Sequence, residues 1–176
     1  YRYNDDYLTY LEASIAEIDA EYHPEYDFTT AIHNAFIERK YVAEKDSDDY
    51  AGKSENVVKN ALKTKYYAER AFNLIRAEDN GFQNFDRNTD RVGNSKVEEM
   101  DLYKDEAMYV VKIGNTSGKL CYAVDQCLTS LKLYKNGNLH GMPEIHTAVL
   151  WLVLDRGHIE DTNGKPDLSR LKMLML

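Results

Sequence analysis

A chain of 176 residues with 43% hydrophobic and 30% charged residues has the composition of one folded globular domain. No stretch approaches the roughly 18 apolar residues that a membrane-spanning helix needs, so we expect no association with a membrane. The net charge of −8 disfavours phosphate binding through lysine and arginine alone, although a divalent metal ion on carboxylates reverses the local charge. Cys121 and Cys127 match no zinc or redox spacing, which indicates reduced thiols in a cytoplasmic protein.

The N-terminal part of the chain is predicted to be helical. A first helix should end near Tyr22, because Pro24 follows, and a second helix is expected over residues 29–44. The polar segment 45–53 is predicted as a loop. We assign residues 1–53 to an N-terminal helical layer.

The remainder, residues 54–176, mixes helices with strands and is expected to pack with the first layer into one compact domain. The predicted elements are a helix over 54–78, a short strand around 82–85, a loop over 86–95, strands over 97–103 and 107–113, a helix over 119–133 and a strand over 147–154. The last strand is apolar throughout, as expected where helices cover both faces of a sheet. The sequence therefore predicts an α/β (α+β) fold in which a central mixed sheet of about four strands is flanked by helices.

The hairpin within residues 97–113 carries the residues of greatest chemical interest. With Asp105 and Glu106 as a two-residue turn, regular pairing places Asp101 opposite Val110. Alternation of side chains then predicts one polar and one apolar face, which carry Glu99, Asp101, Val110 and Lys112 on the first and Met100, Leu102, Val111 and Ile113 on the second. Asp101 and Lys112 should therefore lie within reach of a shared ligand.

A carboxylate beside a lysine on adjacent strands is typical of a metal-dependent nuclease. Asp101 would bind Mg²⁺, with further carboxylate ligands from Glu69 on the preceding helix and from Glu98 or Glu99. Lys112 would then stabilise charge on the phosphate. A plainer interpretation is that Glu99 and Lys112 form an exposed cross-strand ion pair with no catalytic role.

The loop Gly114–Gly118 precedes a helix, where backbone N–H groups favour anions. Lys112 and Lys119 flank this loop, so we predict a phosphate site made by Lys112, Ser117 and Lys119. A capped helix start explains the same residues without any ligand.

Fourteen tyrosines are an unusual number for this length. Most of them sit singly at helical spacing. Half-buried packing explains that spacing better than a base-stacking platform does.

The order helix, strand, strand, strand, helix, strand over about residues 54–154 resembles the PD-(D/E)XK nuclease core, which includes restriction endonucleases and defence nucleases. The motif here is Asp101 on the second strand and V-V-K ending at Lys112 on the third. The resemblance implies metal-dependent phosphodiester hydrolysis, with Gln126 matching a glutamine often found on the following helix. Val110 stands where the superfamily has a second acidic residue, so one of the glutamates named above would have to replace it.

A second resemblance rests on V-E-E-M-D-L-Y at 97–103, Y-V-V-K at 109–112 and T-S-G-K-L at 116–120. These runs are similar to a sporadically distributed bacterial family of unknown function (domain of unknown function 6119), whose closing F-S-K-like segment has a counterpart in L-S-R-L-K at 168–172. The resemblance implies a piece of a larger protein of phage defence or mobile elements. It assigns the family's pattern to Glu98, Asp101 and Lys112.

Three functions stay open at this stage. The first is a nuclease-like module that binds DNA or RNA and cuts it, and the second is a degenerate, non-catalytic version used for protein interaction or nucleic-acid binding. The third is a structural or assembly domain whose charged pair is only an ion pair. The chain opens on Tyr1 rather than Met, so the rest of a longer polypeptide is an expected partner, and a homo-oligomer is compatible with the sequence.

Overall fold

The structure is a computed structural model that describes residues 5–86, 89–92, 95–98, 100–114, 116–139 and 141–154. For residues 15, 89–92, 95–98, 117 and 120 it describes the backbone alone. The chain divides into two compact units, one with residues 1–27 and 155–176 and the other with Phe28–Leu154, and each is treated separately below. None of the helices in these described ranges is both long enough and apolar enough to cross a bilayer.

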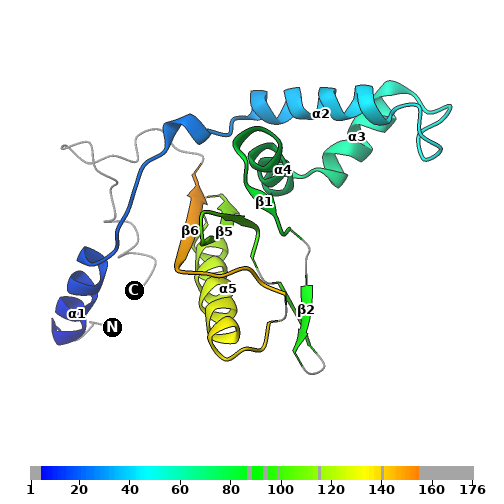
Figure 1. Cartoon of the computed structure of the whole chain (residues 1–176). Helices are drawn as coiled ribbons and strands as arrows, with labels where there is room; N and C mark the ends of the chain where they lie inside the picture. The colour runs from blue at the N-terminus through cyan, green and yellow to red at the C-terminus, as the bar shows by residue number, and fades with distance from the viewer. Residues whose placement is uncertain are drawn as a thin grey trace. The chain divides into compact units, whose positions relative to one another are not determined.

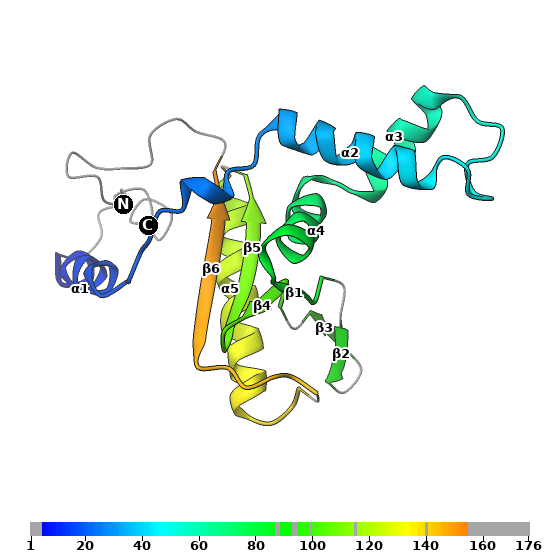
Figure 2. The ribbon, with the colours of Figure 1, turned by 45° about the horizontal axis from the view of Figure 1, so that its top comes forward.

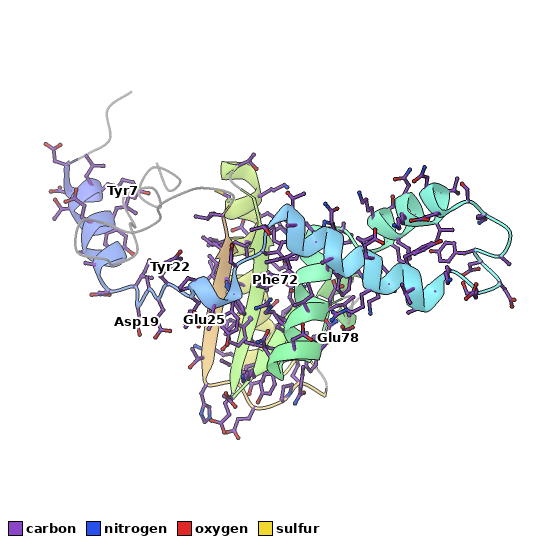
Figure 3. All side chains as sticks on the ribbon, turned by 90° about the horizontal axis from the view of Figure 1, so that it is seen from above. Tyr7, Asp19, Tyr22, Glu25, Phe72 and Glu78 are labelled. Atoms are coloured by element: carbon purple, nitrogen blue, oxygen red, sulfur yellow. The ribbon has the colours of Figure 1, made fainter. Side chains whose placement is uncertain are left out.

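In the first unit, helix α1 (Asp5–Ala16) is followed by the 3₁₀ turn η1 (Pro24–Tyr26). The helix was predicted to end near Tyr22, but it ends at Ala16. Acidic residues follow its end, where the helix dipole disfavours negative charge, and its last turn holds no basic residue. Two of these acidic residues, Asp19 and Glu25, are labelled in Figure 3.

The second unit contains four helices and six strands in its described residues (Figure 1). They are α2 (Thr30–Glu44), α3 (Glu55–Lys65), α4 (Ala68–Asn80), β1 (Gln83–Asn84), β2 (Thr89–Val92), β3 (Ser95–Glu98), β4 (Leu102–Lys104), β5 (Ala107–Ile113), α5 (Ser117–Lys135) and β6 (Thr147–Val153). Four strands form one sheet in the order β1-β4-β5-β6, with β5 and β6 parallel and the other neighbours antiparallel. The predicted mixed α+β fold with a four-stranded mixed sheet is confirmed, whereas the domain boundary after residue 53 stays a prediction.

Helices α4 and α5 lie on opposite faces of this sheet (Figure 2). On one face, Val110 is fully buried and packs with Ala123 of α5. On the other face, Tyr109 of β5 and Trp151 of β6 pack together. The Phe72 ring of α4 lies edge-on to the Trp151 ring, with 5.1 Å between the ring centroids. The two helices explain why β6 is apolar at every position after its first residue.

The predicted continuous helix over residues 54–78 is wrong, because the chain leaves the helical conformation at Tyr66 (φ −114°, ψ 60°). The Tyr66 ring is buried edge-on against Phe36 of α2, and its hydroxyl donates a hydrogen bond to Glu44. His33 Nε2 hydrogen-bonds the Tyr66 carbonyl at 2.7 Å. Burial of the Tyr66 ring against α2 therefore separates α3 from α4, and Glu69 lies in the first turn of α4.

The hairpin turn is confirmed, but the strand before it is shorter than predicted. Asp105 and Glu106 have φ angles of 49° and 60°, and Lys104 pairs with Ala107. However, residues 95–98 belong to β3, which pairs with β2 in a separate two-stranded sheet. The predicted loop over residues 86–95 therefore contains a strand.

The predicted division into a polar and an apolar face is wrong. Leu102 pairs with Tyr109, yet the Asp101 N–H also donates to the Tyr109 carbonyl at 2.9 Å. Two successive residues thus oppose one, as in a β-bulge, and alternation breaks there. Met100 consequently packs with Val110 beneath α5, so the sheet face that was predicted to be polar is buried in the core. The polar groups lie instead at the end of β5.

The turn generates a stability prediction. A left-handed conformation costs a residue other than glycine about 1 kcal/mol, and type I′ turns prefer glycine at the second central position. We expect Glu106→Gly to raise the free energy of unfolding by about 0.5–1 kcal/mol in urea titrations. Glu106→Ala removes the same exposed ion pair to His146 without relieving the backbone, so a Gly variant no more stable than the Ala variant would contradict the prediction.

Candidate functional site

Strand β5 continues past the end of β4, and two carboxylates take the place of the missing strand. Regular pairing between β4 and β5 ends at Tyr109, four residues before the end of β5 at Ile113. The Val111 N–H donates to Asp101 Oδ2 at 2.7 Å, and the Ile113 N–H donates to Glu69 Oε2 at 3.3 Å. Amides two residues apart on one strand lie about 6.6 Å apart, so the two carboxyl groups are held side by side.

Lys112 completes this group of charged side chains. Its Nζ donates to Glu69 Oε1 at 2.8 Å, and the two side chains are 17% and 19% exposed. The same Nζ lies 5.5 Å from the ring centroid of Tyr122 on α5. Burial alone would lower the pKa of Lys112, but the hydrogen bond to Glu69 and the attraction of Glu69 and Asp101 outweigh it and raise that pKa. Lys112 is therefore a firmly charged ammonium group between α4 and α5.

Asp101 has the largest shift in this group. Burial of its carboxyl raises the pKa from the ordinary value of 3.8 to about 7. The Val111 N–H opposes this shift, Glu69 and Asp86 add to it by repulsion, and Lys112 opposes it by attraction. Near neutral pH the Asp101 side chain is therefore close to half protonated, as are some catalytic carboxyl groups whose pKa burial has raised.

Asp86 and Arg70 form an ion pair beside Asp101, and neither residue was predicted from the sequence. Asp86 follows β1, whose end lies against Asp101 because the Phe85 N–H donates to the Asp101 carbonyl at 2.8 Å. Arg70 Nε lies 3.6 Å from Asp86 Oδ2 and comes directly after Glu69 on α4. The signal available in the sequence was the position of Asp86, immediately after the short strand predicted at 82–85.

Of the predicted metal and catalytic residues, the structure brings together Glu69, Asp101 and Lys112. Glu99 lies outside the described residues, so the predicted ion pair between it and Lys112 does too. For Glu98 the backbone alone is described, and it pairs with Thr89 in the separate β2–β3 sheet. Among the described acidic side chains, Glu69 is the ion-pair partner of Lys112.

The remaining predicted residues lie on or near α5. Ser117 is the first residue of that helix, and its side chain is not described. Lys119 folds back toward the end of β5, since a Cβ added to Gly114 would lie 3.1 Å from Lys119 Cδ. Gln126 is half-buried one helical turn after Tyr122, on the same side of α5.

Asp101 and Glu69 carry the type of side chain that holds a divalent metal ion such as magnesium. No described set of three or more His, Cys, Asp and Glu side chains is arranged to hold a metal. Magnesium, however, is usually bound through one or two carboxylates, with waters and substrate phosphates as its other ligands. Asp101 accepts one hydrogen bond from the described residues and Glu69 accepts two, while a carboxylate has about four acceptor positions. Asp101 and Glu69 are therefore the residues that would hold such an ion.

No protein-family model, curated protein or solved structure matches this chain. The resemblances to PD-(D/E)XK nucleases and to domain of unknown function 6119 therefore stay predictions.

The raised pKa of Asp101 predicts a characteristic pH dependence of stability. As pH rises from about 4 to about 7, the unfolded chain loses the Asp101 proton while the folded chain keeps it. The folded state then binds more protons than the unfolded state, so the free energy of unfolding falls with rising pH over this window, by an amount of the order of 2–4 kcal/mol.

The matched control is Asp101→Asn, which resembles the protonated acid and keeps an acceptor for the Val111 N–H. Urea titrations at several pH values should show a weaker decline for Asp101→Asn than for the unchanged chain. Equal pH dependence in the two proteins would contradict the assignment of this proton to Asp101.

Proposed function

We propose that the unit Phe28–Leu154 contains a restriction-endonuclease-like core of the PD-(D/E)XK type that hydrolyses phosphodiester bonds of nucleic acid with a divalent metal ion. The observation that carries the proposal is the meeting of Glu69 from α4, Asp101 from just before β4 and Lys112 from β5 at one end of β5. In this proposal the module belongs to a larger protein of bacterial defence or mobile elements.

The order of elements supports the proposal. Helix α4, strands β1, β4 and β5, helix α5 and strand β6 follow one another as in the PD-(D/E)XK resemblance, with the β2–β3 hairpin inserted between β1 and β4. Asp101 precedes the second sheet strand and Lys112 lies on the third. Glu69 would replace the acid that is absent at Val110.

Each residue then has a defined role. When bound to Asp101 and Glu69, a Mg²⁺ ion would lower the pKa of a coordinated water and stabilise negative charge on the phosphate. Asp101 would lose its proton to become a ligand. Because its pKa is near 7, this deprotonation costs little free energy at neutral pH. Lys112 exchanges part of its contact with Glu69 for a phosphate oxygen and supplies positive charge there.

A second candidate is a degenerate core that binds a partner without cutting nucleic acid. Two observations favour it. Val110 is fully buried against α5 at the position of the usual second acid, and both oxygens of Glu69 are already engaged by Lys112 and the Ile113 N–H. In this alternative the carboxylates serve to satisfy the amides at the end of β5.

The two candidates differ in metal binding and in cleavage. Under the first, Mn²⁺ raises the melting temperature of the unchanged chain, and proton release accompanies binding near pH 6–7 because Asp101 loses its proton. Asp101→Asn should abolish both effects. In Mg²⁺, cleavage of single-stranded and duplex DNA and RNA should fall about a hundred-fold or more in Asp101→Asn and in Lys112→Gln.

Lys132→Gln is the control, because it removes an exposed lysine from the last turn of α5, far along the helix from Tyr122. It should cleave like the unchanged chain. Metal binding without cleavage of any of these substrates would support the degenerate core. Cleavage that survives both site substitutions would reject the proposed site.

A further inference from the structure

Tyr122 is an exposed aromatic ring placed next to the lysine of the proposed site. It lies in the second turn of α5 and is 56% exposed, whereas the side chain of Lys112 is only 17% exposed. Lys112 Nζ lies over the ring at 5.5 Å from the centroid. The rings on the two central strands differ from Tyr122, since Tyr109 and Trp151 pack against each other and against Phe82.

Internal packing does not account for this placement. A cation–π contact at an exposed position contributes about 0.5–1 kcal/mol, and most of the Tyr122 ring stays in contact with water. The Lys112 ammonium already has a strong partner in Glu69. The ring therefore offers an open aromatic surface directly beside the group that would contact a phosphate.

The charge of the unit indicates what kind of contact such a surface would add. Several basic side chains of α2, α3 and α4 are paired with acids: Lys40 with Glu78, Lys59 with Glu38 and Glu55, Lys65 with Glu44, and Arg70 with Asp86. Affinity for nucleic acid that comes from phosphate contacts needs free Lys and Arg side chains. In an acidic chain, stacking of bases on aromatic rings is the contribution that does not depend on them.

We infer that Tyr122 stacks on an unpaired base whose neighbouring phosphate contacts Lys112, so that the substrate of this site is single-stranded nucleic acid. The inference rests on the proposed function and narrows its substrate class. A base inside a duplex has both faces covered by its neighbours and cannot reach a side chain in this way, whereas a base in a single strand can.

The test compares two probes in an Asp101→Asn background, which prevents cleavage. One probe is a fluorescent oligothymidylate and the other is an abasic strand of equal length, and binding is followed by fluorescence anisotropy. Tyr122→Ala should weaken binding of the oligothymidylate about 5- to 150-fold, the range that corresponds to one stacked base, and leave the abasic strand unaffected. Tyr122→Phe should bind both probes as the background protein does.

Leu128→Ala is the matched control, since Leu128 is 48% exposed on the same helix but is not at the site. It should change neither affinity. The inference would be overturned if the background protein bound neither probe. It would also be overturned if Tyr122→Ala lost the same affinity for both probes. Metal binding that depends on Asp101, without any preference for the oligothymidylate, would leave the proposed function standing and reject the stacking role alone.

Discussion

The site depends on one constraint, which is that strand β5 extends beyond the strand that should pair with it. An amide at the end of a sheet still needs an acceptor, and leaving a buried amide unsatisfied costs about 1–3 kcal/mol. Here the bulge at Asp101 turns a carboxylate toward Val111, and the start of α4 brings Glu69 to Ile113. The geometry that satisfies the backbone is thus the same geometry that brings two acids together.

This arrangement has an electrostatic cost, which the Val111 N–H and Lys112 offset only in part. Two carboxylates held on neighbouring amides repel each other, and burial penalises the charge on Asp101. Lys112 pairs with Glu69, and repulsion from Glu69 adds to the effect of burial on Asp101, whose proton is the one that a cation would displace. A structural role alone would be served as well by a neutral acceptor at position 101. A carboxyl at this position can in addition serve the cation-binding role proposed above.

The sequence predicted the parts of this fold that follow local rules. The turn at Asp105 and Glu106, the apolar strand β6 and the helix after β5 all have strong local signals, and each is confirmed. The division of the long helix at Tyr66 could not be predicted, because the ring is buried against α2, more than twenty residues away in the chain. The pairing of Glu69 with Lys112 depends on that division.

The error in the face assignment has a similar origin. Strict alternation holds only along an unbroken strand, and a single bulge reverses every side chain beyond it. Met100, which looked like part of the opposite apolar face, is buried with Val110 because the bulge lies between Leu102 and Asp101. Nothing in the local sequence distinguishes this bulge from a regular strand. Likewise, Tyr122 is one of fourteen tyrosines, and its exposure becomes visible only when α5 is placed on the sheet.

The burial of Val110 explains why the second acid would come from α4 in this chain. Val110 lies under Ala123, where no part of its side chain reaches solvent, and a carboxylate there would be desolvated without a partner. Lys112 escapes the same burial because it lies two residues further along, where its long side chain reaches past the helix to Glu69. An acid supplied from the start of α4 reaches the same end of β5 from the other face of the sheet, where the helix dipole also favours its negative charge. A closed core beneath α5 and an acid at Glu69 are therefore compatible with the proposed site, in which Glu69 and Asp101 supply two carboxylates beside the lysine.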